Sequence, residues 1–265
     1  MMIKAEELCK AFDGMEVLRG ASLEVQEGEA VALIGASGGG KTVLLKHLVG
    51  LLRPDHGRVF VDGHDLCRIG GRKLQELRTR FGFLFQGGAL FESMTIFDNV
   101  AFPLREKTDL TENEVHERAM RELDHVGLSG SEGKYPAQVS GGMIKRAALA
   151  RALAQSPEIM LFDEPTTGLD PIIVHAIHEL IESSYRRLGL TAIIVSHEIP
   201  NIFAIVDRVA MLHEGKVCFE GTPEEVMSCE DPVVRDFIRG SLPPEHLRVP
   251  ELTALGHEEK KGEEK

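Results

Sequence analysis

A glycine-rich stretch between an apolar strand and a helix constrains this chain more than any other feature. Residues 30–34 are all apolar, as expected of a short strand that is buried on both faces. Residues 43–49 then repeat apolar side chains at helical spacing. The stretch between them reads Gly35, Ala36, Ser37, Gly38, Gly39, Gly40, Lys41 and Thr42. This order of strand, glycine loop and helix predicts a phosphate-binding loop within an α/β fold.

The residue types in this loop suit a nucleoside triphosphate. Glycines allow the backbone to curl so that successive N–H groups face phosphate oxygens, and the following helix adds its positive N-terminal end. We expect Lys41 to reach the β- and γ-phosphates of ATP, and the Thr42 hydroxyl to bind Mg²⁺. A flexible glycine turn with a chance lysine is the alternative, and the motifs further along the chain argue against it.

Two more apolar strands end in residues that suit ATP hydrolysis. Residues 159–162 lead directly to Asp163 and Glu164, and residues 191–195 lead to His197 through one serine. Because α/β sheets bind ligands at the carboxyl ends of their parallel strands, we expect these side chains at one edge. Asp163 would hold Mg²⁺ through water, Glu164 would orient and activate the attacking water, and His197 would act at the γ-phosphate. A solvated strand end and an ordinary surface or core histidine are the alternatives.

A second anion-binding pattern occurs later in the chain. Ser140, Gly141 and Gly142 precede residues 144–153, which contain good helix formers and an apolar face. A helix start of this kind binds anions, although the same residues are also an ordinary helix cap. One ATP can use both this pattern and the phosphate loop only if they come from facing protomers. The chain is therefore predicted to form a head-to-tail homodimer with ATP at its interface.

With these motifs in this order, residues 1–240 resemble the nucleotide-binding subunits of ATP-binding cassette (ABC) transporters. The resemblance implies that Phe12 stacks on adenine, with Val17 beside it. It also implies that Gln86 binds Mg²⁺ and senses a membrane subunit. The fold it implies is α/β, a P-loop ATPase with a RecA-like core, an N-terminal antiparallel β subdomain and an inserted helical subdomain.

The resemblance assigns further residues to the dimer interface. Ser140, Gly141 and Gly142 would contact the ATP that the partner chain holds, and Asp170 would lie in a loop that crosses the interface. Two residues depart from the usual pattern. Met143 stands where glutamine is usual after the signature glycines, and Val43 replaces a usual hydroxyl next to the ATP-binding Thr42. Both departures would affect contacts with ATP, and neither removes a catalytic group.

The length and hydrophobic content of the chain agree with a single cassette. The 265 residues, 43% of them hydrophobic, suit one large domain, which we place at residues 1–242. Its helical part is expected at about residues 87–154, because Lys41 and Asp163 lie 122 positions apart (163 − 41). Residues 243–265 are rich in charge and are expected to form a disordered tail.

Three segments indicate a narrower resemblance. Residues 84–106, residues 140–143 with their methionine, and residues 231–237 are similar to the Mla/Ttg2/Mkl group, the ATPase subunits of lipid transporters that work with MCE-domain proteins. The resemblance implies transport of phospholipid or a related lipid between membranes, of the type that maintains outer-membrane lipid asymmetry. The partners it implies are an integral-membrane permease and an MCE-domain protein. The apolar residues 87–106 would in part form a groove for a short cytoplasmic helix of the permease.

Composition also bears on where the chain works. A formal net charge of −12 argues against nucleic acid as a partner, since a basic face is expected there. No apolar run approaches the ~20 residues that a membrane-spanning helix needs, and the N-terminus has no apolar signal region. We therefore expect a peripheral protein at the cytoplasmic face of the inner membrane, attached through its partners.

Other functions remain as alternatives at this stage. The chain would otherwise be the ATPase of another ABC importer or exporter, or a soluble ABC ATPase that acts on ribosomes, DNA or iron–sulfur assembly. The spacing between Lys41 and Asp163 leaves no room for the long coiled coil of DNA-repair types. A nucleotide-binding regulator without turnover is a third alternative, against which Glu164 and His197 argue.

His175 and His178 lie three residues apart on a predicted helix and are possible metal ligands. No further ligand follows at a suggestive spacing, so we expect an exposed helix face instead.

Overall fold

The structure is a computed structural model, and it describes residues 2–242. The predicted tail at 243–265 lies outside the described residues. A six-stranded sheet forms the centre, and its strands are parallel except for β10, which pairs antiparallel with β9. In spatial order the strands are β10 (Lys216–Gly221), β9 (Arg208–His213), β3 (Ala30–Ile34), β8 (Thr191–Val195), β7 (Ile159–Asp163) and β6 (Phe81–Leu84). The predicted strands at 30–34, 159–162 and 191–195 are thus neighbours in one sheet, as the α/β prediction requires.

A second, antiparallel sheet comes from the N-terminal part of the chain. Its order is β2 (Met15–Val25), β1 (Ile3–Phe12), β4 (His56–Val61) and β5 (His64–Asp65). β1 and β2 are joined by a turn at Asp13 and Gly14, which have positive φ angles of 50° and 82°. Such angles suit the two-residue turns of β-hairpins, which explains the Asp-Gly pair.

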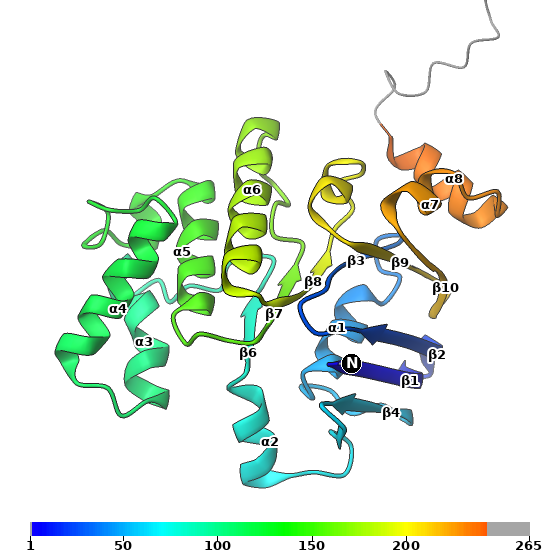
Figure 1. Ribbon diagram of the computed structural model, residues 1–265, viewed down its shortest axis with the longest axis horizontal. Helices are drawn as coiled ribbons and strands as arrows, with labels where there is room; N and C mark the ends of the chain where they lie inside the picture. Colours follow the sequence, from blue (N-terminus) through cyan, green and yellow to red (C-terminus); the bar gives the residue numbers. More distant parts are fainter. Residues whose placement is uncertain (1, 243–265) are drawn as a thin grey trace, which may run out of the picture.

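Three helices lie together at the opposite end of the molecule from the antiparallel sheet (Figure 1). They are α3 (Ile96–Lys107), α4 (Glu112–His125) and α5 (Gly141–Leu153), all within the residues predicted to be helical. Each is preceded by a hydroxyl side chain that accepts a hydrogen bond from the first turn, namely Thr95, Thr111 and Ser140. These caps satisfy backbone N–H groups that have no partner inside a helix, so the sequence itself fixes where the helices begin.

The remaining helices complete the fold around the central sheet. They are α1 (Lys41–Leu48), α2 (Gly71–Arg78), α6 (Pro171–Leu188), α7 (Pro223–Met227) and α8 (Pro232–Ser241), with short 3₁₀ turns η1 (Pro136–Gln138) and η2 (Asn201–Ile205). Within residues 2–242, none of the helices has both the length and the apolar character that crossing a membrane requires.

The inner strands β3, β7 and β8 of the central sheet are buried on both faces, and their successive side chains enter different cores. In β3, Ala32 and Ile34 face a core shared with α3, α4, α5 and α6. Val31 and Leu33 face a second core shared with α1 and the antiparallel sheet. All four are fully buried. Such continuous burial explains the uninterrupted apolar runs that identified these strands.

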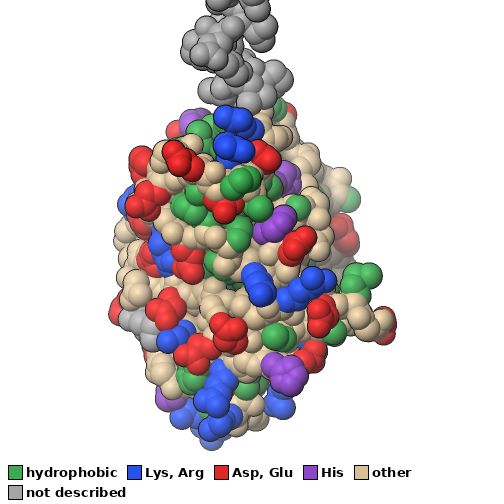
Figure 2. Space-filling model, turned by 90° about the vertical axis from the view of Figure 1, so that its right-hand side faces the viewer, with side chains coloured by type: hydrophobic (Ala, Val, Ile, Leu, Met, Phe, Trp, Pro, Cys, Tyr) green, Lys and Arg blue, Asp and Glu red, His purple; other side chains and the backbone are tan. Residues whose placement is uncertain are grey.

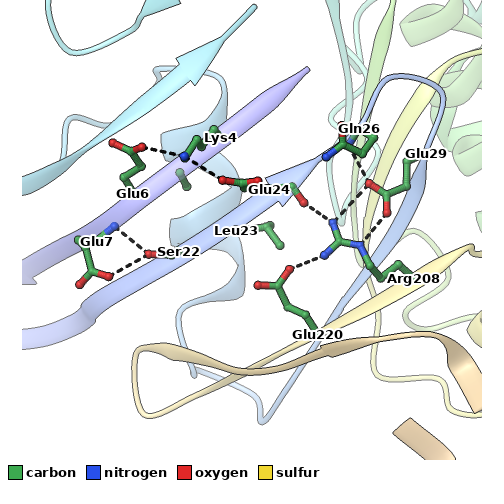
Figure 3. A pocket seen from close by; sticks show the side chains of 11 residues that line it. Lys4, Glu6, Glu7, Ser22, Leu23, Glu24, Gln26, Glu29, Arg208 and Glu220 are labelled. Carbon is green, nitrogen blue, oxygen red and sulfur yellow. Dashed lines mark hydrogen bonds and ion pairs between the residues drawn. The ribbon is translucent and has the colours of Figure 1, made fainter. Parts of the chain in front are cut away.

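One arginine joins the two sheets. Arg208 in β9 donates to Glu29 Oε1 at 2.6 Å, and it also bonds Glu220 in β10 and the carbonyl of Glu24 in β2. These groups line an acidic pocket with Lys4, which bridges Glu24 and a further glutamate (Figure 3). The acidic excess is not confined to this pocket. Figure 2 shows acidic side chains scattered among basic ones over the face turned toward the viewer.

The prediction of an exposed histidine face on α6 is wrong for His178. His175 is exposed and lies 3.2 Å from Glu179, but His178 is only 2% exposed and neither ring nitrogen has a hydrogen-bond partner in the structure. Burial lowers the pKa of His178 to about 4, with the charge of His175 contributing. Among residues 2–242 no cluster of three or more His, Cys, Asp or Glu suits a metal ion. His178 is therefore a core residue.

His178 should make the fold sensitive to acid. Its folded pKa of about 4 lies below its ordinary value of 6.5, so protonation favours the unfolded chain. The stability that neutral His178 allows is complete above pH 6.5 and declines as the pH falls toward 4. At pH 5 the loss should be about 2 kcal/mol, at 1.36 kcal/mol per pKa unit. Urea unfolding at pH 7 and pH 5 measures it.

We expect His178→Leu to lose correspondingly less stability between these two pH values than the parent. His175→Leu on the same helix is the matched control, because His175 is exposed, and it should keep most of the parent's loss, since burial is the larger cause of the lowered pKa. Equal losses in the parent and in His178→Leu would contradict the assignment.

Candidate active site

The glycine-rich loop connects β3 to α1 and needs glycine at defined positions. Gly35 has φ +143°, and a Cβ atom there would lie 2.2 Å from the carbonyl oxygen of Leu212 in β9. Gly40 caps α1 in a left-handed conformation with φ +96°. A Cβ atom at Gly40 would lie 3.0 Å from Cγ1 of Val17 in β2. The loop can therefore follow this path only with glycine at both positions.

Lys41, the first residue of α1, is folded back into the loop. Its side chain is 5% exposed, and Nζ donates to the carbonyl oxygens of Gly35 at 2.8 Å and Ala36 at 2.9 Å. Burial lowers the pKa of Lys41, while the negative charges of Glu164 and Asp163 act in the opposite direction. A buried ammonium held only by neutral carbonyls is well placed to bind an anion that enters the loop.

Thr42 and Asp163 meet although 121 residues separate them. The Thr42 hydroxyl donates to Asp163 Oδ1 at 2.8 Å, which joins the start of α1 to the end of β7. Asp163 is 6% exposed, and burial raises its pKa against the opposing effect of the Thr42 hydrogen bond. A hydroxyl and a carboxylate in contact are oxygen donors of the kind that Mg²⁺ takes. The residues present therefore fit the predicted metal.

Glu164 is the meeting point of three strand ends. Its Oε2 accepts from Gln86 Nε2 at 2.9 Å and from Thr167 Oγ1 at 3.1 Å, while its Oε1 lies 3.7 Å from His197 Nδ1. Gln86 follows β6, Glu164 follows β7 and His197 follows β8. The His197 distance is too long for a hydrogen bond. The predicted carboxylate, glutamine and histidine thus share one edge of the parallel sheet.

The backbone of Glu164 is unusual as well. Its φ angle is +49°, in the left-handed region that disfavours residues other than glycine, and its N–H donates to the Val195 carbonyl at 3.0 Å. Such a conformation persists only where surrounding contacts hold it, and it clusters at functional sites.

The predicted adenine residues lie at the end of the antiparallel sheet where β1 turns into β2. Phe12 ends β1 and is 41% exposed, with Lys10 Nζ 5.4 Å from its ring centroid. Val17 lines a shallow pocket with Gly38 and Gly39 of the loop. An exposed aromatic ring of this kind can stack on a planar base. Ser37 is exposed on the same loop, and Val43 contributes to the apolar core beneath α1.

The signature residues form a second cluster at the start of α5. Ser140 Oγ accepts from the N–H of Met143 at 3.3 Å, and a Cβ atom at Gly142 would lie 2.8 Å from Ile173 Cγ2 of α6. Asp170 caps α6, where its Oδ1 accepts from the N–H groups of residues 172 and 173 at 3.1 Å. Across residues 2–242, no hydrogen bond joins Ser140, Gly141 or Gly142 to the glycine-rich loop. The two motifs predicted to bind anions are therefore not joined to each other by hydrogen bonds.

Sequence reasoning missed several residues that contact this site. Thr167 bonds the Glu164 carboxylate, and Lys145, which is 6% exposed, donates to the Gln86 carbonyl oxygen. Arg151 donates to the carbonyl oxygens of residues 88 and 89, each at 2.7 Å. Only the basic residues gave a signal in the sequence, since Lys145 and Arg151 interrupt a helix whose other inward positions are small and apolar.

The chain is similar to known proteins along most of its length. Residues 18–167 match the profile of the family described as ABC transporter. MlaF of Haemophilus influenzae, the ATP-binding protein of an intermembrane phospholipid transport system, is 45% identical over 83% of each chain. The probable ribonucleotide transport ATP-binding protein mkl of Mycobacterium leprae is 42% identical over 90% of this chain and 69% of its own.

Solved structures of ATP-binding cassettes are also similar to this chain. The ATP-binding cassette MJ0796, in a dimeric post-hydrolysis state with ADP and Pi, superimposes with a TM-score of 0.77 at 30% identity, over 84% of this chain and 99% of its own. The cbiO1 protein from Clostridium perfringens, part of the ABC transporter complex cbiONQ, gives 0.78 at 31% identity over 92% and 96%.

A glycine-rich loop whose Thr42 contacts Asp163, next to Glu164 at the end of β7, is typical of a nucleotide-hydrolysing cassette. The chain belongs to the ABC transporter family. It is an ATPase cassette that binds and hydrolyses ATP, and cassettes of this fold dimerise. The predicted fold class is confirmed.

The contact between Thr167 and Glu164 makes a testable contribution to hydrolysis. Thr167→Val removes the hydroxyl that donates to Glu164 Oε2, and Thr167→Ser keeps a donor. A hydrogen bond to a charged group contributes about 1.5–3 kcal/mol, so kcat for ATP should fall by about 10- to 150-fold in Thr167→Val. The serine variant should stay close to the parent, and nucleotide affinity should change little in both. A valine variant with the parent's kcat would show that this hydroxyl does not position the carboxylate.

Proposed function

We propose that this chain is the ATP-hydrolysing subunit of a transporter that moves phospholipid or a related lipid between membranes. It would work with an integral-membrane permease and an MCE-domain protein, as a peripheral subunit at the cytoplasmic face of the inner membrane. The observation that carries the ATPase part is the convergence of Gln86, Glu164 and His197 beside the glycine-rich loop. The lipid part is supported by the MlaF relatives, whose system is named for intermembrane phospholipid transport.

We assign the residues of one chain as follows. Phe12 stacks on adenine beside Val17, and the N–H groups of residues 35–43 surround the phosphates. Lys41 exchanges its loop carbonyl partners for β- and γ-phosphate oxygens. Glu164 accepts a proton from the attacking water, and His197 donates a hydrogen bond to the γ-phosphate.

The metal would be held at the junction of α1 and β7. Thr42 and Gln86 supply neutral oxygens, and Asp163 supplies a carboxylate through water. Bound Mg²⁺ neutralises charge on the phosphate oxygens. Gln86, whose amide already donates to Glu164, would change partners as the site fills.

The signature residues would act on the partner's nucleotide. Ser140, Gly141 and Gly142 present a capped helix start to the γ-phosphate held by Lys41 of the other protomer. Asp170, at the start of the neighbouring helix α6, would lie at the same interface. The exposure of Ile172 beside it, at 81%, supports an interface here, since a large apolar side chain gains by being covered.

A second cargo is supported by other relatives. The mycobacterial mkl proteins are named as probable ribonucleotide transport proteins and are 42% identical to this chain. An ATPase subunit and its site residues are equally suited to either cargo. Transport of labelled phospholipid and of labelled ribonucleotide by the complete complex separates the two.

ATP should close a head-to-tail dimer of this chain. Glu164→Gln keeps the hydrogen-bonding shape of the carboxylate but removes its basicity, so ATP should bind and persist. We expect this variant to run as a dimer with ATP and as a monomer without it in gel filtration. A variant that stays monomeric at saturating ATP, alone or with its membrane subunit, would contradict the dimer.

ATP binding by mixed dimers tests whether the signature residues contact the partner's nucleotide. Gly142→Asp places a negative side chain at the signature, and Lys41→Ala removes the phosphate contact of the loop. A heterodimer of the two variants keeps one complete composite site and should bind one ATP, whereas each variant homodimer keeps none. Equally poor binding in the heterodimer and in both homodimers would show that the signature does not act in trans.

Docking of the permease should depend on Phe91. Phe91 follows Gln86 closely, is 45% exposed and packs edge-on against Phe102 at 5.0 Å between centroids. A glutamate here would place a charge in an apolar contact, so Phe91→Glu should lose the permease and lipid transport while ATP binding by the subunit survives. Leu188→Glu, equally exposed at 45% on α6, is the matched control and should keep both. Normal lipid transport by Phe91→Glu would place docking elsewhere.

A further inference from the structure

The segment between β6 and α3 has almost no regular structure, yet side chains satisfy much of its backbone. Lys145 donates to the carbonyl oxygen of Gln86, and Arg151 donates to those of Gly88 and Ala89 at 2.7 Å each. Both basic residues belong to α5. Backbone carbonyl groups outside helices and strands need such partners wherever water is excluded, since an unpaired one costs free energy comparable to a lost hydrogen bond.

Asn99 of α3 holds the second half of the same segment. Its side chain is fully buried, and Oδ1 accepts from the Phe91 N–H at 2.7 Å. Its Nδ2 donates to the carbonyl oxygens of Phe91, Met94 and Thr95 at 3.1, 3.3 and 3.0 Å. The backbone of residues 86–95 is therefore fastened to helices α5 and α3.

The Gln86 side chain makes the opposite connection. Its side-chain amide donates to Glu164 at the edge of the parallel sheet, while the backbone carbonyl oxygen of the same residue accepts from Lys145 on α5. Gln86 thus links Glu164, the carboxylate that we assign to water activation, to α5, the helix that Ser140 caps. Lys145 follows Ser140 by five residues, about 7.5 Å along the helix axis at 1.5 Å per residue.

The burial of Lys145 is costly, which argues that it serves a purpose. Its side chain is 6% exposed, and burial lowers its pKa, with only the charge of Glu164 acting in the opposite direction. A buried ammonium is usually less favourable than an apolar side chain of similar volume. Arg146, the next residue of α5, makes the simpler kind of contact, since its NH1 reaches the carbonyl oxygens of Val126 and Gly127 at 3.2 Å at the end of α4.

We propose that Lys145 is a positioning residue for ATP hydrolysis, because its ammonium ties the Gln86 peptide to the signature helix. When Ser140 contacts the partner's nucleotide, α5 and the Gln86 loop move together, and the contact between Gln86 and Glu164 changes with them. Each ATP site is thereby linked to the nucleotide of the other. The inference rests on the proposed trans role of Ser140.

The test compares variants of two neighbouring basic residues in the full chain. Lys145→Met removes the ammonium but keeps the volume, Lys145→Arg keeps a donor, and Arg146→Met removes a carbonyl contact of the same helix that does not reach the Gln86 loop. We expect kcat to fall about tenfold in Lys145→Met, since small displacements of reacting groups reduce rates by such factors. KM for ATP should change less than about threefold, as Lys41 and Ser140 remain. Lys145→Arg should recover most of the rate, and Arg146→Met should match the parent.

Two results would overturn the proposal. One is a folded Lys145→Met chain with the parent's kcat, and the other is an equal loss in Arg146→Met. Should Lys145→Met fail to fold, Lys145→Gln decides, because its amide is uncharged and one atom shorter. Its kcat should fall at least threefold, and an unchanged kcat would reject the role of Lys145.

The dimer experiment separates this inference from the proposed function. Glu164→Gln with Lys145→Met should still dimerise with ATP, because the phosphate and signature contacts are intact. If Glu164→Gln alone fails to dimerise, the trans role of Ser140 is wrong, and the proposed link between the two sites fails with it. If it dimerises but Lys145→Met hydrolyses ATP at the parent's rate, only the role of Lys145 is wrong.

Discussion

The in-register pairing of β3, β7 and β8 is the constraint on which the rest of this molecule depends. Val195 pairs with Leu33 on one side and with Asp163 on the other, so the three strands end at the same level. Their side chains are buried on both faces, and a slip by one residue would exchange the two cores. This register brings the glycine loop, the two acids and His197 to one edge.

Burial makes the ionised side chains at that edge electrostatically unfavourable. Burial lowers the pKa of Lys41 and raises that of Asp163, so the ionised form of each side chain is less stable here than it is in water. A bound anion near Lys41 and a cation near Asp163 would each favour the ionised state. The strained φ of Glu164 is part of the same arrangement. Packing of the sheet tolerates these costs because the apolar strands beneath are fully buried.

Local signals predicted the inner strands of the parallel sheet and the polar residues that follow them. Apolar runs marked these strands, because strands buried on both faces consist mostly of apolar residues. Ser140 marked a helix start, because its hydroxyl caps α5. The failure at His178 has an equally local reason. Its spacing from His175 indicates a helix, but the side of the helix that faces the core depends on what packs against it.

The sequence by itself determined the class of site, since a loop of Gly35 to Thr42 after a buried strand has few other uses, and Asp163, Glu164 and His197 follow strands of the same kind. Only the tertiary structure decided which groups surround them. Lys145 lies 59 residues from Gln86. No periodicity or motif in the sequence identifies the carbonyl oxygen that Lys145 contacts. Helix packing alone brings an ammonium to a carbonyl so distant in the chain, and this is why the attachment of the Gln86 loop to α5 became visible only in three dimensions.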